Sequence, residues 1–297
     1  MKPAPFNYHR PSTIEEALTL LSETQGAELM AGNQSLGLDM ASRNKRPDHI
    51  VDLDAVDELS FLDVTNERVE VGAMVTHRTI ERSEELDQAL PMLPESAKIA
   101  GLSVRNRGTM GGSVAEADPA GNYPAALRAL EGSINLRSLQ GARSVPAREF
   151  FTSYMSTDMR ENELVESVTV DRSQFPMDRT GMSFIELKRS ALGWADVSAA
   201  AAVRVAKPDE SEPTIEHARL ALANVADVPP AVDAVPRELE GEPLTESAAE
   251  AVERAATAAA DPSEKVHTDG EFKPDIAGTY GRRAIERAYD RATADST

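Results

Sequence analysis

Residues 105–113 read Arg-Asn-Arg-Gly-Thr-Met-Gly-Gly-Ser, and the chain continues through Ala117 and Asp118 toward a predicted helix. Glycine tolerates positive φ and lets a ligand approach the main chain closely. Successive backbone N–H groups in such a turn form a concave site for anions, and the threonine and serine hydroxyls add donors. The part from Gly108 to Ser113, here called the glycine segment, is therefore predicted to be a loop that holds a phosphate group.

A second stretch of this kind lies upstream, directly after a predicted strand at residues 28–31. It is called the first loop, and it reads Ala31-Gly32-Asn33-Gln34-Ser35-Leu36. Neither stretch matches G-x-G-x-x-G after a strand or the P-loop pattern G-x-x-x-x-G-K-[ST]. Two such stretches, each on its own α/β unit, favour one shared ligand without identifying it.

The periodicity of the chain divides it into three units, at residues 1–53, 54–170 and 171–297. In the first unit, Ser12 and Glu15 are predicted to form a capping box ahead of a short amphipathic helix. In the second unit, Val69 and Val71 alternate with charged residues and predict a strand. Pro124 is expected at the first position of a later helix.

The third unit has strands first and helices last, the order of a sheet with helices packed on one face. Its polar connections include residues 207–213. The predicted strands are 183–187, 199–205 and 215–222, and the predicted helices are 246–259 and 277–292.

Composition narrows the classes of function. Hydrophobic residues make up 41% of the 297 residues, which is typical of a globular protein. No stretch approaches the roughly 20 apolar residues of a membrane span. The polar N-terminal residues lack the apolar core of a secretory signal, so the protein is expected to be cytoplasmic. The chain has no cysteine, which excludes disulfides and cysteine-bound iron–sulfur clusters.

The charge is strongly negative, with 50 acidic against 31 basic residues and a net charge of -19. Nucleic acids and anionic membranes are poor partners for such a surface. Few lysines, many acids and many alanines are typical of a halophilic protein, although an acidic mesophilic protein stays an alternative. The five histidines have no metal-ligand spacing and are expected at the surface or at helix caps, so no metal site is predicted.

The sequence resembles a known family, the medium FAD-binding subunits of molybdenum hydroxylases such as carbon monoxide dehydrogenase and xanthine dehydrogenase. The resemblance covers nearly the whole chain. The matching stretches, in order, are Phe6 to Pro11, Ala31 to Leu36, Gly72 to Thr76, Arg105 to Ser113, Asp118 to Ala120, Pro124 to Leu127, Leu187 to Arg189, Ala199 to Val203 and Arg282 to Ile285.

The resemblance implies an α+β fold of two FAD-binding subdomains, of the p-cresol methylhydroxylase and vanillyl-alcohol oxidase type. A C-terminal domain of antiparallel sheet with helices on one face would follow. It also implies the residues that bind FAD: Ala31, Gly32, Asn33, Gln34, Ser35, Leu36, Ala73, Val104, Gly108, Thr109, Gly111, Gly112, Ser113, Ala117, Asp118, Leu164 and Lys188.

Within this set, Ala31 to Ser35 and Thr109 to Ser113 would hold the diphosphate. Lys188 and also Trp194 would lie near the flavin ring, although Trp194 is equally expected as a core aromatic residue. The chain departs from the family pattern at two positions, because Asn33 replaces a usual glycine and Ser113 replaces a usual asparagine. Both replacements are small and polar, so they affect fine geometry rather than binding.

The family further implies an electron path and no catalytic acid, base or nucleophile in this chain. The molybdenum cofactor would lie on a large subunit and the [2Fe–2S] clusters on a small subunit. Electrons would pass from the clusters to FAD in this chain and then to an external acceptor. The arginines Arg105, Arg107 and Arg189 would face phosphate or a partner, or form plain surface ion pairs.

Two other functions stay open. A self-contained FAD oxidase or reductase on the same fold would need its own acid or base, and often a histidine or cysteine linked to the flavin. The chain has no cysteine and no histidine in either flavin-binding stretch, so non-covalent FAD is expected. A nucleotide-binding or assembly module without catalysis is the other alternative, and the two intact stretches argue against it.

Overall fold

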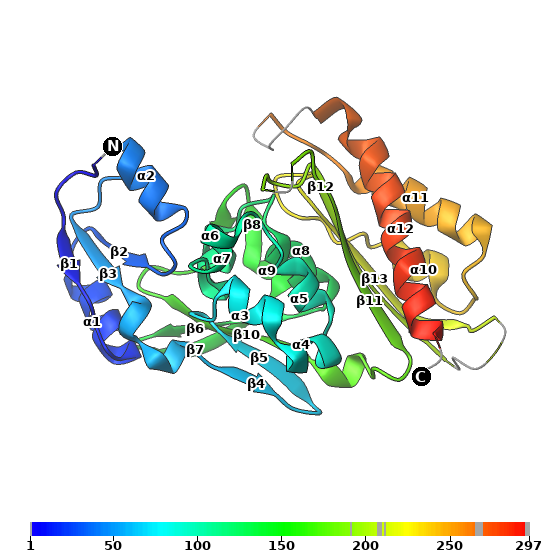
Figure 1. The fold of residues 1–297 in the computed structure, drawn as a ribbon, viewed down its shortest axis with the longest axis horizontal. Helices are drawn as coiled ribbons and strands as arrows, with labels where there is room; N and C mark the ends of the chain where they lie inside the picture. The colour runs from blue at the N-terminus through cyan, green and yellow to red at the C-terminus, as the bar shows by residue number, and fades with distance from the viewer. Residues whose placement is uncertain (1, 191, 207–209, 211, 265–269, 295–297) are drawn as a thin grey trace.

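The structure is a computed structural model, and it describes residues 2–190, 192–206, 210, 212–264 and 270–294. The described residues form a mixed arrangement of helices and sheets (Figure 1). Three sheets of three or more strands follow one another along the chain, and a two-stranded ribbon, β8 (Phe151–Ser153) with β9 (Ser156–Thr157), accompanies them.

The first sheet is parallel, with the strand order β1-β3-β2. Its strands are β1 (Asn7–His9), β2 (Ala27–Met30) and β3 (His49–Asp52). Helix α1 (Ile14–Glu23) connects β1 to β2, and α2 (Leu36–Ser42) lies between β2 and β3. The first loop therefore connects the end of β2 to the start of α2, where the N–H groups of a helix are free to bind a ligand.

The capping box of α1 differs from the prediction by one residue. Thr13 is the extended N-cap residue, and its hydroxyl accepts a hydrogen bond from the backbone N–H of Glu16 at 3.1 Å. The Glu16 carboxylate in turn accepts from the backbone N–H of Ser12 at 2.8 Å. Ser12 and Glu15 were the wrong pair because threonine caps a helix as serine does, and the helix begins at Ile14.

The second sheet is antiparallel, with the order β4-β5-β10-β6-β7. The helices between β5 and β6 lie above it in Figure 1. The strands are β4 (Leu62–Val64), β5 (Arg68–Gly72), β6 (Ser133–Ser138), β7 (Gly141–Pro146) and β10 (Leu164–Asp171). The helices are α3 (His77–Arg82), α4 (Glu84–Ala89), α5 (Met92–Ser96), α6 (Leu102–Arg105), α7 (Met110–Glu116) and α8 (Asn122–Ala129), with α9 (Ala147–Phe150) after β7.

Helix α8 begins earlier than expected. Gly121 is its N-cap residue and Asn122 its first residue, so Pro124 occupies the third helical position rather than the first. The backbone N–H groups of the first turn have no partner within a helix. Proline is therefore accommodated at this position as well as at the one that was predicted.

The third sheet is antiparallel and is formed by β11 (Thr180–Leu187), β12 (Val197–Val205) and β13 (Ile215–Ala223). Helices α11 (Glu246–Ala259) and α12 (Lys273–Thr293) lie along its outer face, beside the short helix α10 (Val235–Leu239) (Figure 1). The predicted order of strands before helices is confirmed for the described residues. Part of the predicted connection at 207–213 lies outside them.

Both faces of this sheet are covered, not one. Along β12, Ala199 and Ala201 pack into the core shared with the C-terminal helices, whereas Ala200 and Ala202 pack into the core shared with the second sheet. These small side chains let the neighbouring helices pack close to the sheet. Gly181 in β11 shows how close α12 lies, because a Cβ there would be 1.9 Å from the carbonyl oxygen of Ala288. The sequence predicted only the face that the C-terminal helices cover. The other face is covered by helices of the second unit, which are distant in the chain.

Two classes of site are absent from the part of the chain that the structure describes. No helix there combines the length and the apolar character needed to cross a membrane. No cluster of three or more histidine, cysteine, aspartate or glutamate side chains there is arranged as a metal site.

Candidate cofactor site

The first loop and the glycine segment lie against each other. A Cβ on Gly32 would be 2.0 Å from the carbonyl oxygen of Arg107 and 2.8 Å from the Cα of Gly108. On the other side, a Cβ on Gly112 would lie 3.5 Å from the Cβ of Ala31. The structure therefore places the backbones of the two stretches in contact, although the sequence predicted each stretch independently.

The first loop presents backbone donors. Within the described chain, no backbone carbonyl or side chain accepts from the N–H groups of Gly32 to Ser35. Ser35 is the N-cap residue of α2, and its side chain makes no capping hydrogen bond. Gln34 folds back, with its amide donating to the carbonyl of Gly32 at 2.9 Å. This row of donors at the start of a helix suits an anionic ligand such as a diphosphate.

The backbone explains the departure at Asn33. Its φ is 59°, in the left-handed region that glycine adopts without strain and asparagine adopts more readily than other residues. The Asn33 side chain also lies over the helix start, because a Cβ on Gly37 would be 2.6 Å from Asn33 Oδ1. Asparagine can therefore replace glycine here without changing the path of the loop.

The glycine segment is largely the start of a helix, so the prediction of a loop through Ser113 is wrong. Thr109 is the N-cap residue of α7, and its hydroxyl accepts from the N–H of Gly112 at 3.1 Å. The N–H of Met110 donates to Val75 at 3.0 Å, and that of Gly111 donates to Ala73 at 2.8 Å. The short helix was missed because these contacts, with the segment that follows β5, are long-range.

Close packing, rather than positive φ, accounts for the glycines. The glycines with positive φ, Gly26, Gly141 and Gly241, all lie outside the two stretches. A Cβ on Gly111 would instead lie 2.5 Å from the Cβ of Ala73, and one on Gly108 would lie 2.6 Å from Nε2 of His77. Tolerance of positive φ is therefore not the reason for glycine at these positions. Among the glycines of the two stretches, only Gly112 is half-buried and has space for a side chain on the side that faces the first loop.

Of the other predicted residues in the second unit, some are buried in the core and some lie in α6 or at the end of α7. Ala73 and Leu164 are 3% and 1% exposed, and their side chains belong to the core beneath α7. Val104 is half-buried in α6, and Ala117 caps the end of α7 with φ of 51°. Asp118 begins the next turn, where Oδ1 accepts from the N–H of Ala120 at 2.9 Å.

Lys188 and Trp194 lie between β11 and β12 of the third sheet. The ammonium of Lys188 pairs with Glu186 at 2.9 Å and donates to the carbonyl of Lys98 at 3.3 Å, so this side chain joins the third sheet to the segment before α6. Trp194 is 48% exposed, which contradicts its alternative assignment as a core aromatic residue. Gln34, in the first loop, and Ser113, in α7, are both half-buried, so part of each side chain stays exposed.

Arg105 and Arg189 form ion pairs within the chain. Arg105 pairs with Glu81 at 3.1 Å and donates to the carbonyl of Ala100 at 2.6 Å, in a half-buried position. Arg189 pairs with Asp196 at 3.0 Å. Of the alternatives that the sequence left open for these two arginines, the structure therefore shows ion pairs within the chain.

His77 is a supporting residue that the sequence did not identify. It is 5% exposed, and its Nδ1 lies 3.2 Å from the hydroxyl of the fully buried Tyr123. Its backbone N–H also donates to the carbonyl of Gly108 at 2.9 Å. His217 is 9% exposed as well, so the expectation of surface or capping histidines is wrong for these two. His267 lies outside the described residues.

The burial of His77 predicts a pH-dependent stability. Burial, together with the positive charge of nearby Arg105, lowers its pKa from 6.5 to about 4. The unfolded chain binds this proton below pH 6.5 and the folded chain only below about 4, so stability is lost as the pH falls through this window. Between pH 6 and 4.5, wild type should lose up to about 1.4 kcal/mol per pH unit more than His77→Gln.

Urea unfolding at a series of pH values measures this difference. The slopes of the unfolding free energy against pH are compared, rather than the free energies themselves, because the slope reports proton binding and the contacts that the variant loses do not change it. Parallel curves for wild type and His77→Gln would show that His77 does not carry the effect.

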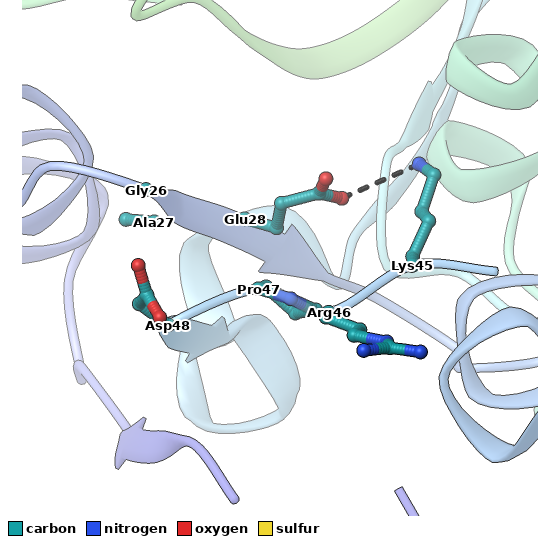
Figure 2. A pocket seen from close by; sticks show the side chains of 7 residues that line it. All are labelled: Gly26, Ala27, Glu28, Lys45, Arg46, Pro47 and Asp48. Atoms are coloured by element: carbon teal, nitrogen blue, oxygen red, sulfur yellow. Dashed lines mark hydrogen bonds and ion pairs between the residues drawn. The ribbon is translucent and has the colours of Figure 1, made fainter. Parts of the chain in front are cut away.

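The surroundings of the site are acidic. Burial raises the pKa of Glu116, at the end of α7, and the nearby carboxylates of Asp118, Asp39 and Glu28 raise it further, whereas Lys45 lowers it. Lys45 itself reaches Glu28 at 3.4 Å (Figure 2). Figure 2 also shows the surface hollow lined by Gly26 to Glu28 and Lys45 to Asp48. That hollow lies at the start of β2, whereas the first loop follows the end of this strand.

Comparison with known proteins identifies two family models in the chain. Residues 4–172 match a model described as the FAD binding domain in molybdopterin dehydrogenase. Residues 182–288 match a model described as the CO dehydrogenase flavoprotein C-terminal domain. The first match contains both stretches of the candidate site, and the second contains Lys188 and Trp194.

Relatives cover the chain along nearly its full length. The carbon monoxide dehydrogenase medium chain of Hydrogenophaga pseudoflava is 34% identical over 98% of this chain and 99% of its own length. The nicotine 6-hydroxylase medium subunit of Paenarthrobacter nicotinovorans is 31% identical over 98% of this chain and 100% of its own length.

Solved structures agree with these relatives. The carbon monoxide dehydrogenase structure from Hydrogenophaga pseudoflava, which lacks the Mo-pyranopterin moiety of the molybdenum cofactor, matches with a TM-score of 0.91 at 34% identity, over 98% of this chain and 99% of its own. Quinoline 2-oxidoreductase from Pseudomonas putida 86 matches with a TM-score of 0.90 at 29% identity, over 99% and 100%. The chain therefore belongs to the family of FAD-binding medium subunits of molybdenum hydroxylases.

Proposed function

We propose that this chain binds one FAD non-covalently and passes electrons from a separate [2Fe–2S] subunit through the flavin to an external acceptor. The observation that carries the proposal is the contact between the first loop and α7, with the N–H groups of Gly32 to Ser35 unpaired within the described chain. Bound flavin supplies the redox chemistry, and the protein binds and orients it.

Each part of the site has a proposed task. The N–H groups of the first loop and the hydroxyl of Ser113 hold the diphosphate, because a row of donors can bind an anion without a lysine. Thr109 fixes the start of α7 through its bond to Gly112. Leu36, Val104 and Asp118 line the rest of the cofactor, and Lys188 lies near the flavin ring. Ala73, Ala117 and Leu164 support these walls from the core.

We further propose the domain boundaries 1–53, 54–170 and 171–297. The three sheets support them, because their strands span residues 7–52, 62–171 and 180–223. The proposed subdomain fold is that of the p-cresol methylhydroxylase and vanillyl-alcohol oxidase type. A parallel sheet followed by an antiparallel sheet, with the cofactor stretches between them, is the support for this assignment.

The proposed partners are a large molybdenum-cofactor subunit and a small [2Fe–2S] subunit. Relatives named as medium chains and medium subunits belong to multi-subunit enzymes. This chain has no cysteine with which to bind such a cluster, so the cluster must lie on another chain.

Acid precipitation of the purified chain tests the mode of flavin binding. All of the yellow colour is expected in the supernatant, as FAD, with one equivalent per chain. The reason is that neither stretch contains a cysteine or histidine to which the flavin could be linked. Colour that stays with the pellet would contradict non-covalent binding, and FMN in the supernatant would contradict the assignment of a diphosphate site.

We also propose adaptation to high salt, for which the net charge of -19 and the scarcity of lysine are the support. The melting temperature is expected to rise by roughly 10 °C between about 0.1 and 3 M KCl, because the screening length falls from about 10 Å to below 3 Å. Sucrose, which stabilises proteins by exclusion without screening charge, is the control solute. A flat or falling melting temperature in KCl would refute the adaptation.

A further inference from the structure

Asn224 connects parts of the chain that are far apart in the sequence. It directly follows β13, is 1% exposed and has φ of 60°. Its backbone N–H donates to the carbonyl of Pro119 at 2.7 Å. Its side-chain Nδ2 donates to the carbonyls of Ala195 at 2.7 Å and Asp196 at 3.2 Å. One residue of the third unit therefore binds both a turn of the second unit and the segment that precedes β12 in its own unit.

The segments that Asn224 joins carry two of the candidate site residues. Pro119 follows Asp118, whose backbone carbonyl accepts from the N–H of Gly121 at 2.8 Å and closes the turn after α7. Ala195 follows Trp194. The hydrogen bonds of Asn224 thus tie the turn of Asp118 to the loop of Trp194, which lie on opposite sides of the boundary between the second and third units.

A buried lysine completes the connection. Lys273, the first residue of α12, is 1% exposed, and its ammonium donates to the backbone carbonyl of Asn224. Burial lowers the pKa of Lys273 to about 8, and nearby Asp196 opposes that change. A buried amine is retained only where it is hydrogen-bonded, so the contact indicates a fixed position for the carbonyl of Asn224.

We propose that Asn224 is a positioning residue for the flavin site. It holds residues 192–196, here called the Trp194 loop, against residues 118–121, here called the Asp118 turn. This inference rests on the proposed function, because it places the flavin beside these two segments. The main-chain bonds of Asn224 require only its left-handed backbone, which glycine also adopts. The two carbonyls of the Trp194 loop require the side-chain amide, so the positioning role belongs to the carboxamide.

Asn224→Gly separates the two contributions, because it keeps the left-handed backbone and both main-chain bonds and removes only the amide. Asn162→Gly is the matched control, since Asn162 has φ of 64° and no side-chain hydrogen bond of its own is recorded in the described structure. Asn224→Asp tests the donor directly, because a carboxylate of the same shape cannot donate to both carbonyls.

Trp194 is the only tryptophan of the chain, so its fluorescence reports on the loop. In the full-length apoprotein, Asn224→Gly is expected to raise the acrylamide quenching constant about twofold and to weaken FAD binding about tenfold. Asn224→Asp should do the same, and Asn162→Gly should match wild type. A melting curve of each variant verifies that it is folded.

The outcomes separate the two proposals. Wild-type protein that binds no FAD overturns the proposed function. Wild-type protein that binds FAD, with Asn224→Gly indistinguishable from Asn162→Gly in quenching and affinity, overturns only the role of Asn224. If Asn224→Gly does not fold, Asn224→Asp decides: unchanged quenching and FAD affinity in that variant also overturn the positioning role.

Discussion

Replacing Gly112 by valine is expected to weaken FAD binding at least about 100-fold while the apoprotein stays folded. Gly112 is half-buried in the first turn of α7, and its open side faces the first loop. A Cβ there would lie 3.5 Å from that of Ala31, an ordinary contact, and 3.0 Å from the Thr109 hydroxyl. The two further methyl groups of valine would enter the space proposed for the diphosphate.

Steric exclusion, not backbone strain, is the reason for this effect, because φ of Gly112 is not positive. Gly111 and Gly32 are poorer choices for the experiment. A Cβ at either would strike backbone or Cβ atoms at 2.5 Å or less, and the fold itself would then be disturbed. Among these positions, a substitution at Gly112 is therefore expected to affect ligand binding most while disturbing the fold least.

Equilibrium binding of FAD to the apoprotein measures the effect, with a melting curve to verify folding. Gly121 lies outside the two stretches but is a poor control, because a Cβ there would lie 2.9 Å from the carbonyl oxygen of Asp118. Gly270→Val is the better control, since its nearest neighbour would be Pro262 at 3.4 Å. Equal flavin content in wild type and Gly112→Val would exclude the proposed diphosphate site.

Substrate-driven reduction of the flavin is expected only when two other subunits are present. The isolated chain should show flavin absorbance and slow reduction by dyes, but no hydroxylation or dehydrogenation of a carbon substrate. The reason is that the chain has no cysteine with which to bind the iron–sulfur clusters of the proposed electron path. Purification from the native source should yield a large molybdenum-cofactor subunit and a small [2Fe–2S] subunit together with this chain.

The decisive measurement is anaerobic absorbance of the flavin band, near about 450 nm for an oxidised flavin cofactor. Substrate should bleach the band in the complex and leave it unchanged in the isolated chain. The complex without substrate is the control. Turnover of a substrate by the chain alone, or native purification as a homo-oligomer only, would instead support a self-contained flavoenzyme.

Much of the fold could be predicted because its longer elements carry their own pattern. The strands at 199–205 and 215–222 and the helix at 246–259 correspond to β12, β13 and α11 within two residues at each end. The missed elements are short, such as β4 with three residues and α6 with four. Segments of this length have no stability alone, and neighbours distant in the chain hold them in place.

The sequence by itself determined which stretches can approach a phosphate group, and that any iron–sulfur cluster must lie on another chain. Only the tertiary structure decided how those stretches meet. The contact of Gly32 with Arg107, the burial of His77 beneath Gly108 and the bonds of Asn224 to Pro119 and Ala195 are all long-range. Composition and local spacing indicate only which residues are small or polar. Which distant backbone each one faces depends on the packing of whole sheets and helices, because that packing alone brings remote segments within contact distance.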